Sequence, residues 1–313
     1  MLLANSLILR ILSEFEILLF IILFIRINKL ITKLIKFMTV YIGTAGVPLS
    51  CKGGSTLKGV ECVSQLGLSA MEVEFVRGVR MGEKTANAIK FASEKFNIKL
   101  SVHAPYYINL ASLEIKKLED SKQRILTSAR IGNIMGAEII VVHAGFYMGR
   151  SSEKVYNIIK NSLAEIQEIL NSENNKIIIG IETMGKQKQF GTLSEIINLT
   201  SDLENVLPVI DFAHIHARSG GGLKTQEDFS EIFNKIENSS GKIHLHSHLS
   251  GVFYTNGNER HHLTIDSKSP DYSLLAKEII ERKQNITVIS ESPNIEVDAL
   301  KFKRMLQKQL NLV

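Results

Sequence analysis

From residue 38 onward, the sequence alternates short apolar stretches with longer amphipathic ones, eight times, at a spacing of roughly 30 residues. Stretches such as Ile139-Ile-Val-Val142 and Ile177-Ile-Ile-Gly-Ile181 are apolar at every position. Strands that are apolar on both faces are typical of parallel sheets covered by helices. Eight consecutive strand–helix units therefore predict an α/β fold, a (β/α)8 TIM barrel formed as a single domain by residues 38–313.

The expected strands span residues 41–43, 70–75, 99–103, 138–143, 176–182, 205–211, 242–248 and 285–291. The expected helices span residues 55–66, 83–96, 112–135, 152–170, 193–203, 226–236, 272–282 and 297–309. A doubly wound sheet is the alternative, but it normally has fewer strands. The turn after the first expected strand, Gly43-Thr-Ala-Gly-Val-Pro48, also lacks the Gly-x-Gly-x-x-Gly pattern frequent in that fold.

Residues 1–37 form a hydrophobic and basic extension that reads unlike the rest. The apolar run Ile17–Ile25 is shorter than the ~20 residues of a membrane-spanning helix. The extension is interpreted as a membrane-surface helix, a weak anchor or a mis-called start before Met38, and the last is favoured. Its five basic and two acidic residues give +3 of the net +5, leaving +2 for the remainder, so the basic balance is weak support for nucleic-acid binding.

The chain has only two cysteines, Cys51 and Cys62. This count excludes a disulfide framework and a Cys-x-x-Cys metal motif, and it favours a reducing, cytoplasmic compartment, with membrane association through residues 1–37 as the less favoured reading. Any bound metal would therefore be held by histidines and carboxylates.

Five of the nine histidines lie between Lys242 and His262. On a strand, His244, His246 and His248 would point to the same face because side chains alternate. Three imidazoles on one face are typical of a metal site, since neutral imidazole is a good zinc ligand. A solvated polar face is the alternative.

Polar residues also end most of the expected strands. In a barrel these ends surround one mouth, where active sites are built. Four carboxylates gathered there would repel one another unless cations lay between them. The whole set is too large for one zinc ion and suits two or three metals with bridging carboxylates. Its members are His103, His143, Glu182, Asp211, His214, His248, Glu259, His261 and Glu291.

These motifs resemble the endonuclease IV family of apurinic/apyrimidinic endonucleases, within the xylose-isomerase-like barrel superfamily. The resemblance covers about residues 40–310 and rests mainly on His103-Ala-Pro-Tyr-Tyr-Ile-Asn-Leu110, Ile-Asp211-Phe-Ala-His214 and Glu259-Arg-His-His262. It implies three Zn²⁺ ions, with Mn²⁺ possible at one or more positions. The first would be held by His103, His143 and Glu182, the second by Glu182, Asp211, His248 and Glu291, and the third by His214, Glu259 and His261.

The resemblance further implies that Glu182 and Glu291 are catalytic and that Tyr106 and Asn109 contact DNA. Departures from the family pattern leave two choices open. His246 is an alternative to His248 as a ligand, and His262 is an alternative to His261.

The implied activity is hydrolysis of the phosphodiester 5′ to an abasic site in double-stranded DNA, as in base excision repair, by a multi-zinc hydroxide mechanism. The protein is expected to be a monomer without a protein partner. Candidate phosphate contacts are Arg77, Arg80, Lys186, Lys188, Arg218 and Lys224. The alternative is a sugar isomerase or epimerase on the same barrel, using one or two Mn²⁺ or Mg²⁺ ions.

Overall fold

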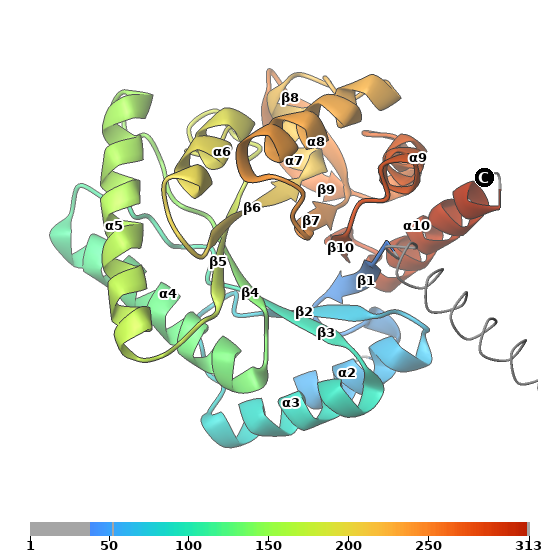
Figure 1. Ribbon diagram of the computed structural model, residues 1–313, viewed down its shortest axis with the longest axis horizontal. Coiled ribbons are helices and arrows are strands. Elements are labelled where there is room, and N and C mark those ends of the chain that lie inside the picture. Colours follow the sequence, from blue (N-terminus) through green and yellow to red (C-terminus); the bar gives the residue numbers. More distant parts are fainter. Residues whose placement is uncertain (1–37, 52, 312–313) are drawn as a thin grey trace, which may run out of the picture. The chain divides into compact units, whose positions relative to one another are not determined.

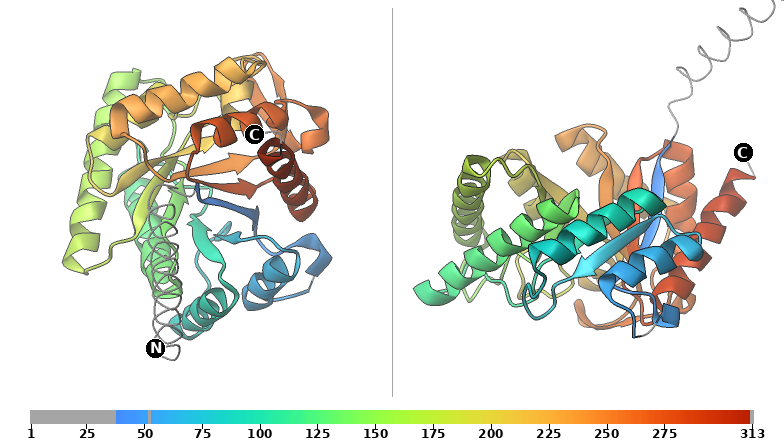
Figure 2. Two further views of the ribbon diagram at one scale, coloured as in Figure 1. Left: turned by 45° about the vertical axis from the view of Figure 1, so that its right-hand side comes forward. Right: turned by 90° about the horizontal axis from the view of Figure 1, so that it is seen from below.

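The computed structural model describes residues 38–51 and 53–311, so the predictions made for residues 1–37 lie outside it. Eight parallel strands form a closed barrel in the order β1-β10-β7-β6-β5-β4-β3-β2, surrounded by helices (Figure 1). The predicted TIM barrel is therefore confirmed. The two further views show the helices packed around the outside of the strands (Figure 2).

The barrel strands are β1 (Val40–Ala45), β2 (Ala70–Glu74), β3 (Lys99–His103), β4 (Ile139–Val142), β5 (Ile178–Glu182), β6 (Val206–Asp211), β7 (Leu245–Leu249) and β10 (Ile286–Ser290). The outer helices are α2 (Thr56–Gln65), α3 (Glu83–Phe96), α4 (Ile115–Met135), α5 (Ser152–Ser172), α6 (Leu193–Ser201), α8 (Gln226–Ser240), α9 (Tyr272–Arg282) and α10 (Ile295–Leu310).

Local sequence explains where several helices begin. Thr192 and Thr225 cap α6 and α8, each in a capping box with an acid three residues on. Ser55 and Ser151 cap α2 and α5 by accepting a hydrogen bond from a backbone N–H. The strands are held by burial, since all four residues of β4 are buried.

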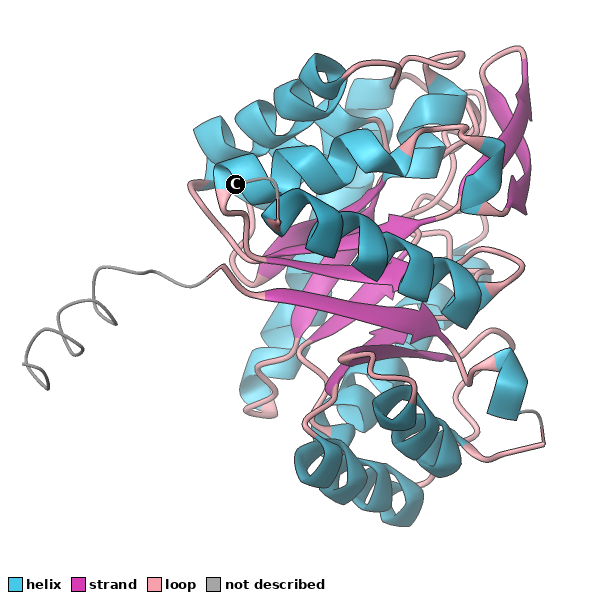
Figure 3. Cartoon of the chain, turned by 90° about the vertical axis from the view of Figure 1, so that its right-hand side faces the viewer, coloured by secondary structure: helices cyan, strands magenta, loops and turns pink. Residues whose placement is uncertain are grey.

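A helix and a hairpin near the mouth of the barrel were not predicted from the sequence. The short helix α7 (Phe212–Arg218) directly follows β6, and a two-stranded hairpin of β8 (Gly251–Thr255) and β9 (Asn258–Leu263) follows β7. The hairpin turn is Asn256-Gly257, with φ of 51° and 68°, a residue pair typical of tight β-hairpins. Figure 3 shows the hairpin outside the barrel, on the side toward which the strand arrows point.

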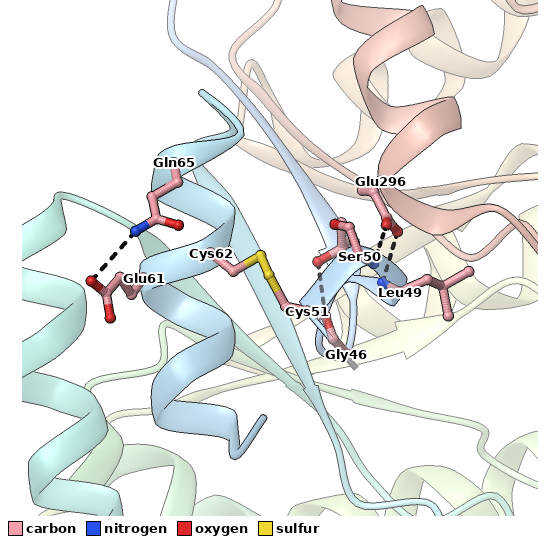
Figure 4. The surroundings of a disulfide bond; sticks show 9 residues. Gly46, Leu49, Ser50, Cys51, Glu61, Cys62, Gln65 and Glu296 are labelled. Atoms are coloured by element: carbon pink, nitrogen blue, oxygen red, sulfur yellow. Dashed lines mark hydrogen bonds between the residues drawn. A yellow bond between two sulfur atoms is a disulfide. The ribbon is translucent and has the colours of Figure 1, made fainter. Parts of the chain in front are cut away.

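A disulfide joins Cys51, in the short 3-10 helix η1 (Leu49–Cys51), to Cys62 of α2 (Figure 4). The cysteine count excludes a disulfide framework and favours a reducing compartment, and it does not predict this single bridge between the two cysteines. Glu296 of α10 accepts hydrogen bonds from the backbone N–H groups of Leu49 and Ser50 at 3.0 and 2.7 Å. The connection after β1 is thus tied to two helices.

Within the described part of the chain, no helix combines the length and the apolar character that crossing a membrane requires.

Candidate metal site

The carboxyl ends of the barrel strands bring the predicted polar residues to one mouth. His103, Glu182 and Asp211 are the last residues of β3, β5 and β6, and each is at most 1% exposed. His248 lies on β7, and His143 and Glu291 directly follow β4 and β10. The closed barrel makes neighbours of residues far apart in sequence: the ring centroids of His103 and His248, which are 145 positions apart, lie 6.1 Å from each other.

Glu182 lies at the centre of this cluster. Its Oε2 atom is 2.8 Å from His143 Nε2 and 3.5 Å from His103 Nε2. Its Oε1 atom is 3.2 Å from the Nδ1 atoms of both His214 and His248. One carboxylate is therefore shared among four imidazoles that come from four different elements.

Asp211 joins the cluster through the start of α7. Its Oδ1 atom accepts a hydrogen bond of 2.7 Å from the backbone N–H of His214 and so caps this helix. The first turn of α7 then places His214 beside the cap, with Nδ1 at 3.6 Å from Asp211 Oδ2. Glu291 approaches from β10, with Oε1 at 3.6 Å from His248 Nδ1.

The hairpin supplies the outer part of the cluster. Glu259 Oε2 is 3.4 Å from His214 Nε2, and His262 Nε2 is 3.8 Å from Glu259 Oε1. In the hairpin register, Phe253 pairs with His261 and Tyr254 with Glu259, which leaves Arg260 as an extra residue. This bulge changes the face on which the following side chains lie, so His262 points into the site with Glu259.

His261 is exposed, and its ring packs against Phe253 with 5.3 Å between ring centroids. The structure therefore places His262, and not His261, beside Glu259 and His214. Of the alternatives for β7, His248 lies within the cluster, whereas His246 faces Glu72 at 2.8 Å.

The residues present fit a group of divalent cations. Three ligand sets each have their donor atoms within 4.8 Å of one another: His103, His143 and Glu182; Glu182, Asp211, His248 and Glu291; and Asp211, His214 and His262. Within the described residues, three buried atoms of these sets, His103 Nε2, Glu182 Oε2 and Asp211 Oδ2, lack a hydrogen bond of normal geometry. Buried polar atoms normally have a partner, and imidazole and carboxylate donors suit zinc.

The charges at the site depend strongly on one another. Burial opposes ionisation of Glu182, but the neighbouring His143 and His248 outweigh it and hold the pKa of Glu182 well below its usual range. Burial also opposes protonation of His103, yet Glu182 and Glu74 prevail and raise the pKa of His103 to about 10. Burial lowers the pKa of His143. Metal-free protein thus holds protons at this cluster near neutral pH.

Two acidic residues of the site were missed in the sequence analysis. Glu72 and Glu74 both lie on β2, and Glu72 is fully buried inside the barrel. Burial raises the pKa of Glu74 to about 8, and its Oε2 atom accepts a hydrogen bond of 3.1 Å from the Tyr106 hydroxyl. The available signal was two acids at alternate positions of an otherwise apolar strand, which places both on one face.

The predicted DNA contacts lie in different environments. Tyr106 is 43% exposed at the mouth, and its ring lies 4.7 Å from that of His103. Asn109 instead braces two loops, since its Oδ1 atom accepts hydrogen bonds from the backbone N–H groups of Ala111 and Phe146 at 3.1 and 3.3 Å.

The basic candidates divide in the same way. Exposed positions are occupied by Arg77, Arg80, Lys186, Lys188 and Lys224. Arg218 of α7 is partly buried and donates to the carbonyl oxygens of Lys186 at 3.0 Å and Gln189 at 2.9 Å. It therefore holds the loop after β5 in place.

A cavity of about 400 Å³ opens onto the cluster. Ligand atoms and the exposed aromatic residue line it together, among them Tyr106, His143, His214, Glu259, His262 and Glu291. Its size falls within the range of small-molecule sites.

Known proteins resemble this chain in sequence and in fold. An uncharacterized protein of Methanocaldococcus jannaschii is 41% identical over 261 residues, covering 82% of this chain and 93% of the relative. A probable endonuclease 4 of Staphylococcus carnosus is 30% identical over 146 residues, covering 45% of this chain and 47% of the relative.

Among solved structures, endonuclease IV from Thermus thermophilus matches with a TM-score of 0.68 and 17% identity, covering 86% of this chain and 100% of that one. A D-tagatose 3-epimerase-like protein matches with a TM-score of 0.66 and 22% identity, covering 86% and 98%. Residues 60–309 match the xylose isomerase-like TIM barrel family as a whole. With the closed eight-stranded barrel and this match, the chain belongs to the xylose isomerase-like TIM barrel family.

Proposed function

We propose that this protein is a metal-dependent endonuclease that hydrolyses the phosphodiester 5′ to abasic sites in double-stranded DNA. The observation that carries the proposal is the chain of three ligand sets that share Glu182 and Asp211. Divalent cations held there would acidify a water molecule and stabilise negative charge on a phosphate. Zinc is favoured because each set contains at least one imidazole beside carboxylates.

The other residues at the mouth would bind the DNA. Tyr106 offers an exposed aromatic face beside the cluster, and Lys186 lines the same cavity. Arg77 and Arg80 are exposed on the connection after β2, where they would contact phosphates along the backbone. Among the predicted contacts, Arg218 and Asn109 would act indirectly, by shaping the loops.

A sequence relative supports the nuclease, whereas solved structures of both an endonuclease and an epimerase-like protein share the fold. The Staphylococcus carnosus relative is described as a probable endonuclease 4. The sequence shared with it spans less than half of either chain.

A sugar epimerase is the second candidate. Glu182, Asp211, His248 and Glu291 form a four-ligand set with three carboxylates, and this set alone would suffice for one Mn²⁺ or Mg²⁺ ion. For an epimerase, the set of Asp211, His214 and His262 would bind no metal.

Metal analysis and an incision assay separate the two candidates. The substrate is a duplex oligonucleotide with one tetrahydrofuran abasic analogue, and the control is the same duplex with an intact base. We expect two to three zinc equivalents in the protein, incision only at the abasic position, and loss of incision in Glu182→Gln. Turnover of a ketohexose such as D-fructose with one metal and no incision would refute the nuclease.

A further inference from the structure

A buried polar group lies beneath the metal site, inside the barrel. Glu72 of β2 is fully buried, and its side chain reaches across the barrel to β7. Its Oε1 atom is 2.9 Å from His248 Nε2, and its Oε2 atom is 2.8 Å from His246 Nε2. Ser101 Oγ of β3 donates to Oε2 at 2.7 Å. All four residues are buried, so solvent does not compete for these contacts.

These contacts determine which nitrogen of His248 carries a hydrogen. An ionised carboxylate only accepts hydrogen bonds, so the nitrogen that faces it must donate. Nε2 of His248 therefore carries the hydrogen, and a neutral ring then has its lone pair at Nδ1. Nδ1 is the atom that lies 3.2 Å from Glu182 and 3.6 Å from Glu291.

We propose that Glu72 is a positioning residue that fixes the tautomer of His248, so that Nδ1 is the nitrogen that binds metal. The opposite tautomer would direct an N–H at Glu182 and Glu291 and would offer no lone pair to a cation. Histidine ligands usually donate their second N–H to a carboxylate, which sets the ring orientation and the tautomer. This inference rests on the proposed metal site.

His246 has a different part in this arrangement. Its ring meets that of His248 edge-on, with 5.8 Å between centroids, and its Nε2 contacts the second oxygen of Glu72. His246 and Ser101 together hold the carboxylate in one orientation. The alternating histidines of β7 thus have different roles: His248 is part of the metal-site cluster, and His246 holds Glu72 in place.

The rival reading is that Glu72, His246 and His248 bind a metal of their own, since their donor atoms also lie within 4.8 Å of one another. Every contact of Glu72 in this group has the length of a hydrogen bond, 2.7–2.9 Å, and a hydroxyl already occupies one of its oxygens. The geometry therefore favours the positioning role.

The first test needs no variant. In zinc-loaded protein labelled with 15N-histidine, long-range 1H–15N spectra distinguish a protonated ring nitrogen from a metal-bound one. We expect His248 to be protonated at Nε2 and metal-bound at Nδ1. Binding through Nε2 would overturn the proposal.

The second test compares Glu72→Gln with Ser101→Ala in a competition titration against a chromophoric zinc chelator. The amide of Gln presents a donor to one of the two imidazoles, so we expect zinc affinity at one site to fall about 10- to 100-fold. Ser101→Ala removes a donor to the same carboxylate without touching a histidine and should change affinity less than about threefold. Thermal melting of the metal-free proteins checks that both variants fold.

The outcomes separate this inference from the proposed function. Wild-type protein that binds no zinc would refute the proposed metal site. Wild-type zinc binding that is unchanged in a folded Glu72→Gln protein would refute the role of Glu72 alone. Loss of one whole zinc equivalent in both Glu72→Gln and His246→Ala would show a separate metal at Glu72 and would likewise overturn the positioning role.

Discussion

Replacing Gly185 with alanine should disturb the outer part of the metal site selectively. Gly185 lies in the loop after β5, and its carbonyl oxygen accepts a hydrogen bond of 3.1 Å from the backbone N–H of Glu259. A Cβ atom at this position would lie 2.8 Å from both Cβ and Oε2 of Glu259, and 3.0 Å from Cδ2 of His214. The new methyl group thus meets two residues of the outer cluster.

The size of the effect follows from these contacts. Glu259 Oε2 can rotate away, but its Cβ is fixed to the backbone, so the hairpin must move away from the loop. Forcing one extra carbon into a well-packed site costs about 1–3 kcal/mol. If that cost falls on the ligand geometry, zinc affinity at the outer site should drop about 5- to 140-fold, since 1.4 kcal/mol is roughly tenfold.

The assay is chelator competition followed by metal analysis of the dialysed protein. Gly185→Ala should lose one metal equivalent and retain the others, because His103 and His143 are not contacted. Gly82→Ala is the matched control, since a Cβ there meets nothing within 4 Å. Full metal content and unchanged affinity in Gly185→Ala would refute the reasoning.

Three further outcomes are expected. Zinc binding at pH 7.5 should release protons and should tighten as pH rises toward 10, because the raised pKa of His103, about 10, keeps this residue protonated in metal-free protein. Calorimetry in two buffers of different ionisation enthalpy measures the number of protons released. Binding without proton release would contradict this prediction. Burial opposes ionisation of Glu195, but hydrogen bonds from Ser152, Thr192 and Tyr147 outweigh it and lower the pKa of Glu195. The ionised Glu195 therefore stabilises the folded protein above pH ~4.5, and this contribution is lost as pH falls. The difference in Tm between wild type and Glu195→Gln should shrink from pH 7 to pH 4, and a larger difference at pH 4 would contradict this prediction. Cys51→Ser should lower the free energy of unfolding by about 3 kcal/mol in oxidising buffer, as expected for bridged cysteines 11 residues apart. In reducing buffer the variant and wild type should have the same free energy of unfolding. Urea titrations in both buffers measure the difference.

The barrel itself could be predicted because its strands are buried on both faces and recur regularly. The hairpin was overlooked although its turn sequence, Asn256-Gly257, is a strong local signal. Helix α7 was also overlooked, since Phe212–Arg218 is only seven residues long and follows a strand without a linker. Short elements inserted into a loop lengthen one connection but add no strand–helix unit, so the predicted number of units was correct.

At the site, the polar residues at the strand ends could be predicted from the sequence, but the pairs of side chains that meet across the barrel could not. Glu72 and His248 lie on β2 and β7, which are not neighbours in the sheet, so strand pairing alone does not bring them together. The choice between His261 and His262 depends on one unpaired residue, Arg260, in β9. A single bulge reverses, for every later residue of a strand, the face of the sheet toward which the side chain points.

The hairpin described above forms a two-stranded sheet of its own. A pair of strands of this size is marginally stable in water unless something else holds it. The hairpin already packs on α7, where Val252 contacts Ala213 and Ala217. A cation bound between His214 and His262 would add a second link, and ligand binding stabilises whichever state binds it. Bound zinc would then lower how often the hairpin opens, and amide hydrogen exchange along Asn258–Leu263 would slow as zinc is added. The order of the outer part of the site would thereby depend on whether metal is bound.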